Sequence, residues 1–121
     1  MTALNPLTQK DWLVDTIAGA ASWSGYLATL LPGDHRNARS SRLLLGLADA
    51  VKALPVAHPL FAKLNQIDHA DTAVRDRWLD EVRLEISYIG LFSDATTREA
   101  IRRLEEITDA SLTEWRQSNL H

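Results

Sequence analysis

Hydrophobic residues recur along this chain with the period of an α-helix, in stretches separated by Pro, Gly, Asp and Ser. Residues three or four positions apart lie on one face of a helix, so each stretch predicts a helix with a buried side. No stretch alternates hydrophobic and polar residues as a half-buried strand does. The chain has 19 Leu and 16 Ala but only 5 Val and 6 Ile. This balance favours helices, because β-branched residues lose rotamer freedom there.

The pattern predicts four long helices and one short helix. Its breaks fall at turn-forming or capping residues, such as Pro32-Gly33 after the first helix. The predicted helices cover about residues 6–31, 40–54, 59–67 and 72–91, and the last starts from Ser93, Asp94 or Thr96, after a turn over residues 90–94, and runs to about residue 117. Short connections place consecutive helices side by side in opposite directions. We therefore expect residues 1–121 to form one all-α domain, an antiparallel helical bundle.

The start of the second helix depends on where Arg36 can lie. If the helix began at Asp34, Arg36 would project into the same hydrophobic stripe as the core leucines. Burial of an unpaired guanidinium is strongly unfavourable. We therefore predict a loop over residues 33–39 and a helix that starts at Ser40 or Ser41, both favourable capping residues.

Each predicted helix carries a hydrophobic stripe that we expect to form the core. The first helix has large residues on one side and small residues on another, which leaves little surface for solvent and predicts a central helix. Its large residues are Trp12, Leu13, Ile17, Trp23, Leu27, Leu30 and Leu31. The stripes of the other helices are Leu43, Leu44, Leu47, Ala50, Val51 and Leu54; Leu60, Phe61, Leu64 and Ile67; Val74, Trp78, Leu79, Val82, Ile86 and Ile89; and Ile101, Leu104, Ile107, Leu112 and Trp115.

Composition and charge exclude several classes of function. The net charge is −3, which opposes non-specific binding to nucleic acid or to an anionic membrane. The chain has no cysteine, so disulfides, thiolate nucleophiles and Cys-ligated metal sites are excluded. Arg is more frequent than Lys and Ala is abundant, a composition typical of GC-rich, bacterial genomes.

A membrane location is not expected. Residues 16–33 carry no charge and approach the length that spans a bilayer. Thr, Ser, Gly and Pro are scattered through this stretch, which favours a buried core helix over a membrane span. The chain starts without the basic and apolar regions of a secretory signal, so we expect a cytoplasmic protein.

The sequence holds no strong catalytic or metal-binding motif. Asp68-His69-Ala70-Asp71 could offer ligands to a divalent metal, but a metal site needs three or four converging ligands. We favour the simpler interpretation that Asp68 or Asp71 caps the next helix. Neither the zinc-protease motif, the di-iron bundle motif, a nucleophile elbow nor a glycine-rich phosphate loop occurs in the chain. We therefore expect neither an enzyme, a metal site nor a cofactor.

Arg36, Arg39 and Arg42 cluster, together with His35, at the expected start of the second helix. Free N–H groups of a helix N-terminus and guanidinium donors suit an anion or a phosphate. The alternative is a solvated basic loop that pairs with the acidic helices of the second half.

Two further groups of residues could contact a partner. Leu84, Tyr88 and Leu91 form a second apolar strip on the fourth helix, away from its core stripe. The small residues of the first helix, among them Ala21 and Gly25, permit close helix approach, either to another helix of the same chain or across a symmetric dimer. The four tryptophans suit core filling, and the alternative is that one lines a pocket or anchors a partner.

These observations lead to one expected function and one alternative. We expect a non-enzymatic protein–protein interaction module, such as a small regulator, inhibitor, adaptor or immunity-type protein. Its partner is another protein or a second copy of the chain, and neither nucleic acid nor membrane. The alternative is a small-molecule or anion-binding protein, in which a tryptophan lines an apolar pocket and Arg36, Arg39 or Arg42 binds an acidic group.

Overall fold

The computed structural model describes residues 6–31, 33, 35–92 and 97–118 of the chain. These residues form five helices and no strand, which confirms the all-α bundle that the hydrophobic pattern predicts. The helices are α1 (Pro6–Leu30), α2 (His35–Ala53), α3 (Pro59–Asp68), α4 (Thr72–Phe92) and α5 (Thr97–Ser118). The caps proposed for the last helix, Ser93, Asp94 and Thr96, lie outside the described residues.

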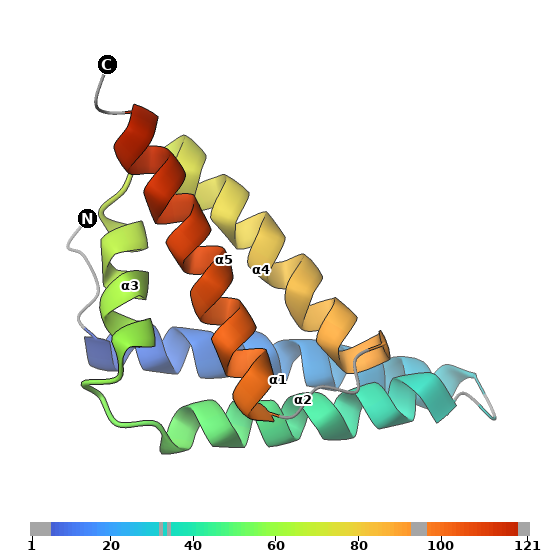
Figure 1. The fold of residues 1–121 in the computed structure, drawn as a ribbon. Coiled ribbons are helices and arrows are strands. Elements are labelled where there is room, and N and C mark those ends of the chain that lie inside the picture. Colours follow the sequence, from blue (N-terminus) through green and yellow to red (C-terminus); the bar gives the residue numbers. More distant parts are fainter. Residues whose placement is uncertain (1–5, 32, 34, 93–96, 119–121) are drawn as a thin grey trace.

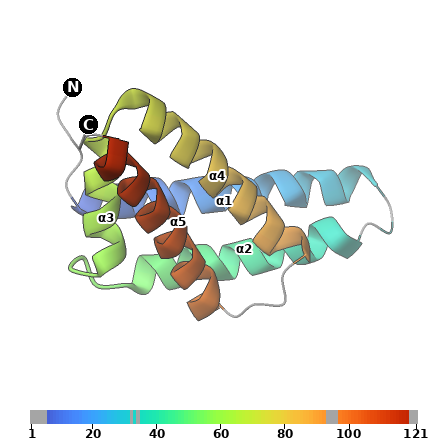
Figure 2. The ribbon, with the colours of Figure 1, turned by 45° about the horizontal axis from the view of Figure 1, so that its top comes forward.

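The helices are arranged as two antiparallel pairs with one helix at the end. Figure 1 shows α1 and α2 side by side as a long hairpin, crossed obliquely by the pair α4 and α5. The short helix α3 lies at the end of the hairpin where α1 begins. In Figure 1 and Figure 2 the end of α1 and the start of α2 extend beyond α4. The core therefore lies between the two pairs, and this far end of the hairpin has few neighbours.

All five helices contribute to one hydrophobic core. The stripes predicted on α3, α4 and α5 are buried or half-buried as expected. The largest side chains with almost no exposure are Phe61, Leu13, Ile17, Leu44, Leu47, Leu60, Ile67, Ile86, Leu104 and Leu112. Asp71 caps α4 as expected, because its Oδ1 accepts from Ala73 N at 2.8 Å. α3 has a cap that was not predicted, since His58 Nδ1 accepts from Leu60 N at 3.1 Å.

The predicted start of the second helix is wrong. α2 begins at His35, so most of the expected loop over residues 33–39 is helical. Arg36 is exposed, because the first turn of α2 extends beyond α4, and its guanidinium is therefore not buried. Ser40, expected as a cap, is instead 1% exposed inside the helix. The predicted break before α2 is correct, and Gly33 has a φ of +82°, which glycine adopts without strain.

The turn expected over residues 90–94 also differs from the structure. α4 continues through Gly90 to Phe92. Gly90 is buried against α2, so its lack of a side chain serves helix packing and not a turn. None of the helices in the described residues combines the length and the hydropathy that crossing a bilayer requires.

Candidate functional site

A cluster of exposed large hydrophobic residues lies on the second half of α1 and at Leu31, directly after its end. Trp23, Tyr26, Leu30 and Leu31 are each more than half exposed, and Trp23 reaches 61%. The rings of Trp23 and Tyr26 contact each other with centroids 5.8 Å apart. We call these four residues the α1 patch. Three of them were predicted to lie in the core, so their exposure corrects the expectation for Trp23, Leu30 and Leu31.

The small residues of α1 explain this exposure. Ala21 is 0% exposed, and a Cβ on Gly25 would lie 3.2 Å from Oγ of Ser41 on α2. Ser24 and Ser40 share a buried hydrogen bond of 3.1 Å between the same two helices. In the second half of α1 the small side therefore faces α2, and Trp23, Tyr26 and Leu30 face outward. Ala21 has no exposed surface that a partner could contact, and Gly25 already lies against α2.

A groove between α1 and α4 continues the α1 patch. Two adjoining hollows share Ala20 of α1 and Ser87 of α4, and one of them also reaches Trp23. On the α4 side Leu84 borders the same surface and is 72% exposed. This places one residue of the predicted apolar strip at the groove that reaches Trp23.

Of the other two residues of that strip, Tyr88 and Leu91, the structure describes only the side chain of Tyr88. Tyr88 is about half exposed, and the guanidinium of Arg103 lies 5.8 Å from its ring centroid. Arg103 also donates to Glu85 at 3.0 Å, so Tyr88 adjoins a polar contact between α4 and α5. The side chain of Leu91 lies outside the described part of the chain.

Arg36, Arg39 and Arg42 lie on the first turns of α2, at the same end of the hairpin as the α1 patch. Arg36 and Arg42 are exposed and Arg39 is half-buried. Because α2 begins earlier than predicted, only Arg36 belongs to the first turn, where helix N–H groups are free. The three arginines give this end a positive charge, since residues 16–48 contain three Arg and a single acidic residue.

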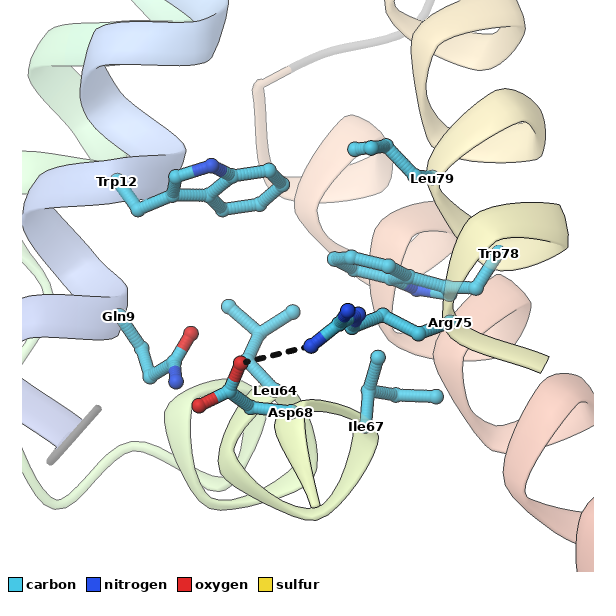
Figure 3. Close-up of a pocket in the computed structure, with 8 residues that line it drawn as sticks. All are labelled: Gln9, Trp12, Leu64, Ile67, Asp68, Arg75, Trp78 and Leu79. Carbon is cyan, nitrogen blue, oxygen red and sulfur yellow. Dashed lines mark ion pairs between the residues drawn. The ribbon is translucent and has the colours of Figure 1, made fainter. Parts of the chain in front are cut away.

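A hollow of about 250 Å³ lies at the opposite end of α1, between α1, α3 and α4 (Figure 3). Its lining residues are Gln9, Trp12, Leu64, Ile67, Asp68, Arg75, Trp78 and Leu79. The rings of Trp12 and Trp78 have centroids 5.5 Å apart and are tilted by 33°. A hydrogen bond to α5 holds Trp78 in place, because its Nε1 donates to Thr108 Oγ1 at 3.1 Å.

Polar groups gather on one side of this hollow. Arg75 Nη1 and Asp68 Oδ1 are 4.0 Å apart, and Figure 3 shows the amide of Gln9 on the same side as Asp68. Gln9 is only 4% exposed. The alternative function from the sequence was an apolar pocket lined by a tryptophan, with Arg36, Arg39 or Arg42 binding an acidic group, but the arginine that lines this hollow is Arg75. Arg75 precedes Trp78 by three residues, which places both on one face of a helix.

The structure offers no metal site among the residues it describes, since no three His, Asp or Glu side chains gather there. Comparisons of the chain with protein-family models, with curated proteins and with solved structures found no match. The function therefore has to be inferred from the geometry and chemistry of the chain itself.

Proposed function

We propose that this protein is a non-enzymatic interaction module that binds another protein through the α1 patch. The observation that supports this proposal is the exposure of Trp23, Tyr26, Leu30 and Leu31 on one uncharged stretch, formed by the second half of α1 and the residue after it. Soluble proteins seldom expose several large hydrophobic side chains together unless the surface binds something. Trp and Tyr are also the residues that contribute most often to binding hot spots.

The expected partner is a helix with a hydrophobic face and acidic flanks. The groove from Thr16 to Leu27 of α1 follows about three helical turns, which is long enough for one amphipathic helix. The arginines at this end of the hairpin favour a negatively charged partner. A regulator, inhibitor, adaptor or immunity-type protein would act in this way, by covering or recruiting its partner.

The test compares proteins retained by the immobilised full chain with those retained by two variants. Trp23→Glu places a charge in the α1 patch, whereas Leu45→Glu places one at a leucine of α2 that is 50% exposed outside the patch. We expect one protein to be retained by the wild type and by Leu45→Glu but lost from Trp23→Glu. Circular dichroism of each variant checks that the fold is intact.

The retained protein is then purified and titrated against the same variants. Support requires that Trp23→Glu weakens its binding at least tenfold and that Arg36→Glu also weakens it. Equal binding by Trp23→Glu and wild type would exclude the α1 patch. Tyr88→Glu tests the α4 strip separately, and a loss confined to this variant would move the contact surface to α4. A wild-type dimer that Trp23→Glu dissociates in sedimentation would identify a second copy as the occupant and overturn the proposal of a different partner.

A further inference from the structure

The hollow beside Trp12 and Trp78 is a second place where this protein can bind something, and it is separate from the α1 patch. It lies at the first turns of α1, whereas the patch lies on the last turns. At about 30 Å³ per water molecule, its 250 Å³ has room for roughly eight waters. This volume falls just below the range of about 300–1,000 Å³ for drug-sized ligands, so the hollow suits a molecule of about ten non-hydrogen atoms.

The walls of the hollow are hydrophobic, and a hydrogen bond holds one of their two indoles in place. The indoles of Trp12 and Trp78 lie on one side, and Leu64 and Ile67 of α3 lie below them in Figure 3. Trp78 is fixed by packing and by its hydrogen bond to Thr108, so its ring is already in position before a ligand arrives. These walls suit an aromatic or branched aliphatic group.

The polar side of the hollow carries charges of both signs. Arg75 Nη1 and Asp68 Oδ1 form an ion pair at 4.0 Å, so a guanidinium and a carboxylate lie side by side at the hollow. Their side chains are 36% and 20% exposed, so both can be reached from solvent while lying beside hydrophobic walls. A guanidinium has five N–H donors, more than one carboxylate can accept from.

We propose that this hollow binds a small zwitterion with a hydrophobic side chain, namely a free aromatic or branched-chain amino acid. The carboxylate of the ligand pairs with Arg75, its ammonium group pairs with Asp68, and its side chain lies against the two indoles. A ligand with a carboxylate alone would bring a second negative charge beside Asp68, and a simple amine would bring a second positive charge beside Arg75. Of the three kinds of ligand, only the zwitterion brings an opposite charge to each of the two groups.

The test uses three ligands that differ only in charge: phenylalanine, phenylpropanoate, which lacks the ammonium group, and phenethylamine, which lacks the carboxylate. Calorimetric titration of the full chain is expected to give binding of phenylalanine at least tenfold tighter than of either analogue. In two-dimensional nuclear magnetic resonance spectra, phenylalanine should shift the indole N–H signals of Trp12 and Trp78 and leave that of Trp23 unchanged.

Three variants test which side chain of the hollow pairs with each charged group of the ligand. Arg75→Gln should weaken phenylalanine at least tenfold while leaving phenethylamine no weaker, and Asp68→Asn should weaken phenylalanine while leaving phenylpropanoate no weaker. Arg77→Gln is the matched control, because Arg77 pairs with Glu114 at 3.0 Å away from the hollow and should leave binding unchanged.

Absence of phenylalanine and leucine binding at millimolar concentration would overturn the proposal. Equal binding of the three ligands, or indole shifts at Trp23 in place of Trp12 and Trp78, would overturn it as well. These results are independent of the test of the α1 patch, because Trp23→Glu, which changes the patch, is expected to leave the hollow intact.

Discussion

Gly90 of α4 and Leu44 of α2 lie so close that a Cβ on the glycine would come within 2.9 Å of the leucine Cδ1. The same Cβ would also meet the hydroxyl of Ser40. Real Cβ atoms essentially never approach other atoms this closely. The crossing of the two helical pairs therefore relies on a glycine at this point, and a side chain there would require buried side chains of α2 to shift.

Gly90→Ala is expected to destabilise the protein by about 1–3 kcal/mol through overpacking. This expected loss of stability is opposite in sign to the difference in helix propensity, which favours Ala over Gly by about 1 kcal/mol. Gly46→Ala is the control, because Gly46 lies in α2 with nothing within 4 Å of a new Cβ, and it should gain up to about 1 kcal/mol. Urea unfolding followed by circular dichroism measures both variants. Equal stability of the two would contradict the close approach of α4 to α2.

The hydroxyls of Ser24 and Ser40 share a hydrogen bond in the buried interface between α1 and α2. Ser24→Ala or Ser40→Ala alone is expected to cost about 1–2 kcal/mol, because the remaining buried hydroxyl loses its partner. The double variant should cost less than the sum of the two, with a coupling of at least about 0.5 kcal/mol in a double-mutant cycle. Strictly additive costs would mean that the two hydroxyls do not interact. Ser22→Ala, on the exposed side of α1, should change stability by less than about 0.5 kcal/mol.

Thr108 links Trp78 to the backbone of α5. Its hydroxyl accepts from Trp78 Nε1 at 3.1 Å and donates to the carbonyl of Leu104 at 2.8 Å. Thr108→Val keeps the shape but leaves the buried indole N–H without an acceptor, so we expect a loss of about 1–3 kcal/mol. Thr108→Ser keeps the hydroxyl and should lose less. A Val variant as stable as the Ser variant, in thermal or denaturant unfolding, would show that the hydrogen bond contributes nothing.

Lys63 of α3 joins the acidic face of α5. Its hydrogen bond to Asp109 at 3.0 Å, opposed by partial burial and assisted by Glu105 at 3.2 Å, raises the pKa of the ammonium above the ordinary 10.5. A raised folded pKa means that the stabilisation is complete below pH 10.5 and is lost as the pH rises through the folded pKa. The groups are partly exposed, so the loss should stay below about 1 kcal/mol.

Lys63→Arg tests this dependence, because arginine keeps its charge to higher pH. Between about pH 10 and 12 the wild type should lose more stability than Lys63→Arg. Lys52→Arg is the control at an exposed position and should follow the wild type. Identical pH profiles for the wild type and Lys63→Arg would contradict the contribution of this ion pair.

The helical periodicity of the sequence was sufficient to predict α3, α4 and α5 and their buried sides. Phe61, Ile86 and Leu104 lie in the core as expected, and Asp71 caps α4. These features depend on which face of its own helix a residue occupies, and that is set by spacing along the chain.

The hollow was only partly foreseen. A pocket lined by tryptophan was one expectation, but the sequence pointed to the arginines of α2 and gave no reason to choose Arg75. The hollow combines Trp12, Asp68 and Arg75 from three different helices. No local sequence pattern indicates which helices pack together. The three-residue spacing of Arg75 and Trp78 did indicate that these two residues lie on one face of a helix.

Residue spacing along the chain was enough to predict a helical protein, most helix boundaries and the buried stripes of the last three helices. The inward side of α1, and how far α2 extends before the core begins, depend on how the helices pack against one another. Spacing does not predict this packing, because side-chain size limits how closely two helices approach. The small side of α1, with Ala21 and Gly25, admits α2 closely, so Trp23 and its hydrophobic neighbours are left facing solvent.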